Sequence, residues 1–236
     1  HVLPDAFDLS LAETQALAGE RVKRDVSKDD VARVHQVAQG WVAGTVLMLD
    51  RLNSGESPTP TQPGAAPELL FDYFYYEVWR GMAPATHHFL LRVALLPRVI
   101  VGAARELTAC SDAEAILSGL VSQNQFTVCH RGKIARYQFH ALFQAFLVAQ
   151  AHESLTSDER QDFLHRAARW AIERERDDDA VTLLTQAEAW PELVGMVLQR
   201  APVLVGSGRN QTLIRWINTL PETVRHKNAW LQYWPA

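Results

Sequence analysis

The amino-acid sequence predicts a mainly α-helical protein with a helical bundle, a winged helix containing one β-hairpin, and a run of paired helical repeats. Apolar side chains recur at helical spacing over most of the 236 residues. Two β-prone runs, Gln125–Cys129 and Ile134–Gln138, are joined by a short glycine-containing connection, as in a hairpin. Beyond Thr156 the helices come in pairs, and each pair takes up about thirty residues, as in a helical-repeat array.

Residues 1–82 form the first predicted domain, a set of helices interrupted by a loop. Ser10 and Ser27 each stand three residues before an acid, so helices are expected to begin directly after them. The second helix is expected to end at Gly40, and a third helix follows it. Prolines and glycines mark Asn53–Pro67 as a loop. A helix from Glu68 to Met82 would be apolar around its whole circumference, so we expect it to lie between two neighbouring units.

Residues 83–152 form the second predicted domain, in which three helices are followed by the hairpin and a closing helix. This is the element order of a winged helix. The predicted helices are Ala85–Leu95, Val99–Ala109, Ser111–Gln123 and Phe139–Ala151. His140 falls on the first turn of the closing helix, away from its apolar stripe. Because a first helical turn offers unpaired N–H groups and the positive end of the helix dipole, His140 is a candidate contact for a phosphate.

Residues 153–236 form the third predicted domain, the start of a helical-repeat array. The predicted helices are Asp158–Arg174, Asp179–Ala189, Pro191–Arg200 and Gln211–Leu220. A single pair of such helices cannot bury its apolar face, so neighbouring pairs are expected to stack. The acidic run Asp177–Asp179 is interpreted as a capping run that complements the dipole of the second of these helices.

Composition argues against several classes of function. The chain has 23 Lys and Arg residues against 27 Asp and Glu residues, a formal net charge of −4, which does not suit a dominant nucleic-acid surface. Cys110 and Cys129 show neither disulfide nor zinc spacing, and a reducing, cytoplasmic setting fits them best. No apolar run has the length of a membrane span, and the first residues are no signal peptide. No grouping of nucleophile, base and orienting side chain indicates an active site.

A series of short strings, in this order, resembles the STAND class of signal-transduction ATPases and, within it, the large LuxR-type transcriptional activators similar to MalT. The strings are Phe7–Ser10, Gly40–Leu47, Phe71–Tyr73, Phe89–Leu91, Asn124–Phe126, Tyr137–Leu147 and Leu164–Trp170. The resemblance covers essentially the whole chain. It implies that the three domains are a helical lid bundle of a nucleotide-binding module, a winged helix, and the beginning of a sensor made of TPR-like helical repeats.

The resemblance also implies a function, that of an internal fragment of a larger ATP-dependent activator that couples ADP or ATP binding and inducer sensing to oligomerisation. His140 would contact ADP in the resting state. Trp41 and Val42 would lie against the adenine, with Val42 standing where the family string has a proline. The implied partners are the ATPase core and the C-terminal DNA-binding domain of the parent protein, an unknown small-molecule or protein inducer, and further copies of the chain on activation.

ADP and ATP are expected to bind the full-length protein, and neither is expected to bind this fragment tightly. The chain contains no G-x-x-x-x-G-K-[ST] sequence, so the phosphate cradle of a P-loop is absent and ATP hydrolysis is not expected from it. No metal site is expected.

Two alternatives to a nucleotide role stay open. In the first, the repeats form a protein-interaction scaffold and His140 is a structural histidine. In the second, the winged helix binds DNA directly through its third helix. The stretch from Ala109 to Gln125 contains no Lys or Arg and carries Asp112 and Glu114, the wrong charge for facing phosphates, so no direct nucleic-acid contact is expected.

Overall fold

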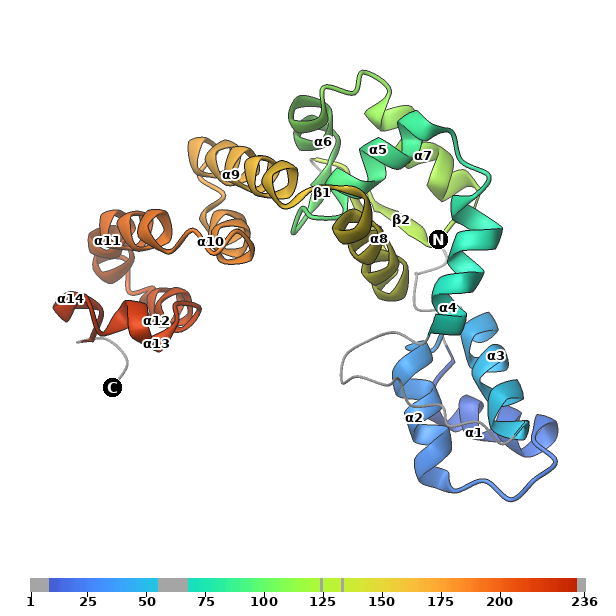
Figure 1. The fold of residues 1–236 in the computed structure, drawn as a ribbon. Helices are drawn as coiled ribbons and strands as arrows, with labels where there is room; N and C mark the ends of the chain where they lie inside the picture. Colours follow the sequence, from blue (N-terminus) through green and yellow to red (C-terminus); the bar gives the residue numbers. More distant parts are fainter. Residues whose placement is uncertain (1–8, 55–67, 124, 133, 233–236) are drawn as a thin grey trace. The chain divides into compact units, whose positions relative to one another are not determined.

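The computed structural model describes residues 9–54, 68–123, 125–132 and 134–232 (Figure 1). Most of the predicted loop Asn53–Pro67 therefore lies outside the described residues, as do Phe7 and the last four residues. The chain divides into two compact units, one made of residues 1–91 and 112–151, the other of residues 92–111 and 152–236. Both units are mainly helical, and the predicted fold class is confirmed.

The first unit holds the helical bundle and most of the winged helix. Its elements are α1 (Leu11–Arg21), α2 (Lys28–Ala38), α3 (Val42–Asn53), α4 (Glu68–Tyr73), the π-helix η2 (Phe74–Trp79), α5 (Pro84–Val93), α7 (Ala113–Ser122), β2 (Thr127–His130), β3 (Arg136–Phe139) and α8 (Ala141–Ser154).

Helices α1 to α3 form the bundle, and the two predicted serine caps are confirmed. Ser10 closes a capping box with Glu13, and the Ser27 hydroxyl accepts a hydrogen bond from the third residue of α2. Arg21 at the end of α1 forms two hydrogen-bonded contacts of 2.8 and 3.0 Å with Asp50 of α3. The side chains between the helices are fully buried; they include Val34, Ala38, Met48 and Leu49.

The aromatic helix expected from Glu68 to Met82 is an α-helix that turns into a π-helix. The N–H of Arg80 bonds to the carbonyl of Tyr75, five residues earlier, which is the π-helical spacing. The expectation that this segment has more than one buried face was wrong. Phe74 is fully buried, but Tyr75 and Tyr76 are 42% and 61% exposed, because one face of the π-helix points to solvent.

Strands β2 and β3 form the predicted hairpin in an antiparallel register that pairs Thr127 with Phe139 and His130 with Arg136. Along β3 the side chains alternate, so that Tyr137 and Phe139 are buried while Arg136 and Gln138 are exposed. Helix α8 follows directly. Its apolar stripe is buried as predicted, through Leu142, Phe143, Phe146 and Leu147.

The second unit holds the helical repeats together with a short preceding segment. Its elements are β1 (Val99–Ile100), α6 (Val101–Thr108), α9 (Ser157–Glu173), α10 (Asp177–Gln186), α11 (Trp190–Gly206), α12 (Asn210–Asn218), α13 (Glu222–Arg225) and α14 (Ala229–Gln232). The helix predicted from Val99 begins only at Val101, because two β-branched residues form a strand before it. Helix α11 continues past the predicted end at Arg200 and includes Pro202.

The acidic run Asp177–Asp179 forms the first turn of α10 and does more than complement the dipole of that helix. No side chain caps the first residue of α10, and each of the three carboxylates instead binds a different arginine. The ion pairs, at 2.7 to 3.2 Å, are Asp177–Arg200, Asp178–Arg215, and Asp179 with both Arg98 and Arg176. The capping interpretation was therefore incomplete, since the run joins α10 to α11, to α12 and to the segment before α6.

Within the part of the chain that the structure describes, every helix is too short or too polar to cross a lipid bilayer.

Candidate functional site

His140 lies at the junction of β3 and α8, and the structure makes it the N-cap of α8 rather than a first-turn residue. Its backbone N–H donates to the carbonyl of Phe126 at 2.7 Å, and its carbonyl accepts from Gln144 at 2.9 Å. Its Nδ1 accepts the N–H of Leu142 at 3.3 Å. The prediction that the helix begins at Phe139 was wrong because Phe139 is paired with Thr127 in the hairpin.

The N-cap geometry decides which nitrogen of the His140 ring can act as a donor. Because Nδ1 accepts a backbone N–H, a neutral imidazole in this position carries its proton on Nε2. The half-buried ring thus satisfies one N–H of the helix terminus through Nδ1, and its other polar atom in this tautomer is the donor Nε2–H. An N-terminal helix end with an N–H donor beside it is suited to a negatively charged oxygen.

Trp41 is the N-cap of α3, and its ring is held by close packing against Gly44. A Cβ added to Gly44 would lie 2.4 Å from Cε3 of Trp41, so only glycine permits this position of the ring. The turn before Trp41 is left-handed, with φ of 51° at Gln39 and 81° at Gly40. This explains both glycines of the string Gly40–Leu47 in physical terms.

The half-buried Trp41 ring belongs to an aromatic cluster at the junction of the bundle and the winged helix. It stacks on Phe74 with ring centroids 5.3 Å apart and meets Tyr73 and Phe126 edge-on, both at 5.1 Å. Val42, the next residue, is 44% exposed and begins α3. Trp41 therefore has a ring held by its neighbours, whereas Val42 presents a small apolar surface to solvent.

Phe126 connects the two predicted site residues, although they are about a hundred positions apart in the sequence. Its ring lies 5.1 Å from that of Trp41 and 6.4 Å from that of His140. Its backbone is left-handed, with φ of 50°, which is strained for a bulky side chain. That conformation accompanies the hydrogen bond that the N–H of His140 donates to the carbonyl of Phe126.

The sequence does not single out Phe126 as a site residue, and for Tyr73 its helical spacing favours a core position over a ligand-stacking one. Both residues occur in the strings that carry the family resemblance, Asn124–Phe126 and Phe71–Tyr73, and those strings were the signal that could have identified them. The structure thus brings Trp41, Phe126 and His140 together. A purine could stack on such aromatic side chains while its phosphates meet an N–H donor.

No metal site accompanies this cluster in the described ranges, where no three His, Cys, Asp or Glu side chains gather closely enough to hold a metal ion. Cys110 and Cys129 are free thiols.

Comparison with known proteins agrees with the architecture. Residues 75–161 match the MalT winged helix domain. Over 238 aligned positions the chain is 28% identical to the HTH-type transcriptional regulator MalT of Vibrio cholerae, an alignment that covers 98% of this chain and 26% of that protein. The fold is also similar to the crystal structure of a STAND protein with a tetratricopeptide repeat sensor from Pyrococcus horikoshii, with a TM-score of 0.50.

The structural match covers 97% of this chain and 33% of the other at 13% identity, so it concerns the fold alone. The chain thus spans about a quarter of the curated relative and a third of the solved structure. The resemblance to MalT found in the sequence is confirmed: residues 75–161 match the MalT winged helix domain, and the chain as a whole is similar to a MalT transcriptional regulator.

Proposed function

We propose that this chain is the regulatory part of an ATP-dependent transcriptional regulator, in which it senses the nucleotide held by an ATPase core. The MalT winged helix and the similarity to a MalT transcriptional regulator along nearly the whole chain support this role. Because this sequence contains no P-loop, the proposal assigns nucleotide binding and hydrolysis to another segment of the longer protein. In this proposal the chain is not itself an enzyme.

The observation that carries the proposal is the position of the His140 ring at the N-terminus of α8. Its Nδ1 is used by the helix, so its Nε2–H can donate to a phosphate oxygen of ADP. The dipole of α8, a helix of 14 residues, adds positive potential at the same end. Trp41 and Phe126 supply aromatic surface beside it, on which the adenine would rest.

Coupling between nucleotide and assembly then requires two states with different affinities for ADP. With ADP bound, the contact to His140 keeps the winged helix against the ATPase core. When that contact is lost, the winged helix separates from the core, and copies of the protein associate. The repeats carry the inducer signal, and a separate DNA-binding domain contacts DNA in the cytoplasm. The acidic α7, with Glu114 and no Lys or Arg, supports a non-DNA role for this winged helix.

The test compares two replacements of His140 in the longer protein that includes the ATPase core. His140→Ala removes both the cap and the Nε2 donor, whereas His140→Asp keeps a good cap and repels phosphate. Both are expected to weaken ADP binding at least about tenfold, the loss of one charge-assisted hydrogen bond. His130→Ala, which changes an exposed histidine of the same hairpin, is the control.

Isothermal titration with ADP measures the affinities, and inducer dependence is read from the oligomeric state. If His140→Asp folds normally and binds ADP as tightly as the unchanged protein, His140 is only a structural cap and the proposal fails. In that case a scaffold role for the repeats would be the better description.

A further inference from the structure

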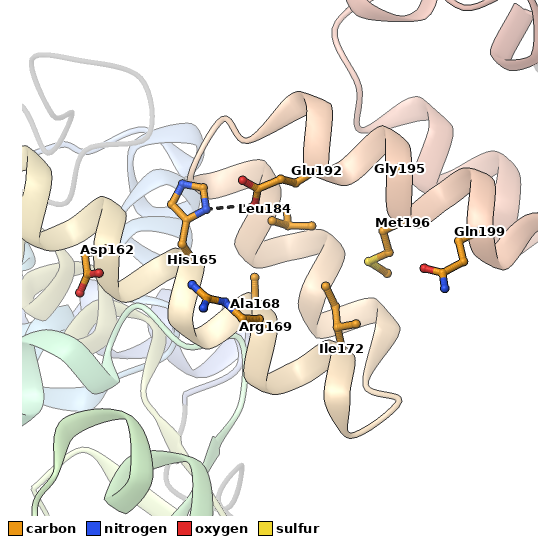
Figure 2. A pocket seen from close by; sticks show the side chains of 10 residues that line it. All are labelled: Asp162, His165, Ala168, Arg169, Ile172, Leu184, Glu192, Gly195, Met196 and Gln199. Carbon is orange, nitrogen blue, oxygen red and sulfur yellow. Dashed lines mark hydrogen bonds and ion pairs between the residues drawn. The ribbon is translucent and has the colours of Figure 1, made fainter.

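A groove in the second unit runs between α9 and α11 and has a volume of about 650 Å3, within the range of small-molecule sites. Figure 2 shows two facing rows of side chains along the two helices. On α9 they are Asp162, His165, Ala168, Arg169 and Ile172, and on α11 they are Glu192, Gly195, Met196 and Gln199. The spacing of three or four residues places each row on one helical face.

The floor of the groove is apolar and its ends are polar. Leu184 of α10 and Met196 are buried below it, and Ile172 lies beside them. At one end His165 Nδ1 contacts a carboxylate oxygen of Glu192 at 3.1 Å, so these two polar groups satisfy each other (Figure 2).

Arg169 is the exception among the arginines of the repeats. Every other arginine between residues 157 and 232 donates a hydrogen bond to an oxygen of the protein, and three of these bonds join two helices. Arg169 has no hydrogen-bond or ion-pair partner among the described residues, and it lines the groove. Glu173, the carboxylate nearest to it along α9, is contacted by Arg174 at 3.5 Å, and Asp162, one turn further away on the other side, is bound by Arg166 at 2.9 Å.

We propose that this groove binds a small organic acid, whose carboxylate pairs with Arg169 and whose apolar part lies on Ile172, Leu184 and Met196. A guanidinium binds a carboxylate through two parallel hydrogen bonds, which suits an arginine that the protein itself does not use. The apolar floor selects an acid with a hydrophobic tail over a fully polar one. The inference goes beyond the proposed nucleotide role, because it assigns a ligand class to the repeat unit.

Gly195 gives the means of closing the groove without damaging the helix. A Cβ at Gly195 meets nothing within 4 Å, so a leucine there extends into open space. Leucine also favours a helix by about 0.8 kcal/mol over glycine, so the Gly195→Leu variant should fold. Gly206, at the end of the same helix, is equally open and does not line the groove, which makes Gly206→Leu the matched control.

The experiment uses 4-phenylbutyrate as the probe and its neutral analogue 4-phenylbutan-1-ol for comparison. The chain has three methionines, so 13C-methyl labelling gives a simple spectrum in which Met196 reports on the groove. Met48, buried in the bundle of the first unit, is the internal reference. We expect saturable shifts of the Met196 methyl with a Kd of about 1 mM for the acid, and about tenfold weaker binding of the alcohol.

The variants separate charge from shape. Arg169→Gln should remove the difference between acid and alcohol, Gly195→Leu should abolish binding of both, and Gly206→Leu should bind like the unchanged chain. The proposal is overturned if the Met196 methyl does not shift up to about 10 mM acid, if acid and alcohol bind equally in the unchanged chain, or if Gly195→Leu has no effect. The measurement uses the 236-residue chain without nucleotide, so its outcome is independent of the ADP test.

Discussion

The buried carboxylate of Asp179 is predicted to stabilise the second unit, and its replacement by asparagine tests that role. Asp179 is only 6% exposed and accepts from Nε of Arg98 at 2.8 Å and from Nε of Arg176 at 2.7 Å. Asparagine keeps the shape but presents an NH2 group to one of the two arginines, so a donor faces a donor. Asp178→Asn changes a carboxylate that binds Arg215 but is 54% exposed, and it serves as the control.

The expected loss follows from burial and from the number of bonds. A hydrogen bond to a charged group contributes about 1.5 to 3 kcal/mol, and breaking a buried ion pair costs about 3 to 5 kcal/mol. The Arg98 side chain is 46% exposed, so water partly replaces its lost partner. We therefore expect Asp179→Asn to lower the free energy of unfolding by about 2 to 3 kcal/mol, against less than about 1 kcal/mol for the exposed control.

Thermal unfolding followed by circular dichroism measures the difference. For a unit of about 100 residues, 1 kcal/mol corresponds to at least about 4 °C, so the Tm should fall by about 10 °C. Hydrogen exchange should show the loss in α9 and α10 rather than in the first unit. If the two variants lower the Tm equally, the buried Asp179 carboxylate with its two arginines gives no more stability than an exposed ion pair, and the reasoning from burial is wrong.

Three further changes test the first unit. Gly44→Ala should lower the free energy of unfolding by about 1 to 3 kcal/mol, because the new Cβ would lie 2.4 Å from the Trp41 ring. The control is Gly19→Ala in α1, where a Cβ has open space, so this variant should be neutral or stabilising. Equal losses of stability in thermal unfolding of the two variants would contradict the packing of Trp41 on Gly44. Val42→Pro should be tolerated and raise the free energy of unfolding by up to about 1 kcal/mol, because Val42 is the first residue of α3, where proline fits a helix. A variant that is less stable than the unchanged chain would contradict this prediction. The pKa of Glu13 lies below its ordinary value of 4.5 because its carboxylate accepts hydrogen bonds from the backbone N–H and the hydroxyl of the N-cap serine. The contribution of the Glu13 carboxylate to stability is therefore complete above pH 4.5 and is lost as the pH falls through the lowered pKa. The free energy of unfolding, measured as a function of pH in acid, should lack this pH-dependent contribution in the Glu13→Gln variant.

Much of the first unit could be predicted because its signals are local. The capping box at Ser10 and the cap at Ser27 lie within four residues of the N–H groups that they satisfy. The hairpin follows from two β-prone runs with a short connection, and the stripe of α8 from helical spacing. His140 was identified as unusual by its position off that stripe. Its nucleotide contact stays a prediction.

The tertiary structure decided which distant residues meet. Nothing local to Phe126 shows that its ring lies between those of Trp41 and His140, since that depends on how the bundle packs against the winged helix. The same reason explains why Asp179 looked like a cap and proved to be a buried ion-pair centre.

The sequence by itself determined the order of the helices, the hairpin and the family resemblance, because periodicity, helix caps and motifs each depend on residues that are close together in the sequence. Only the tertiary structure decided that His140 is an N-cap with its Nε2 as donor, and that Arg169 alone among the arginines of the described repeats has no partner. The partners of a charged side chain depend on how segments far apart in the sequence pack together, and a single sequence does not show which segments meet.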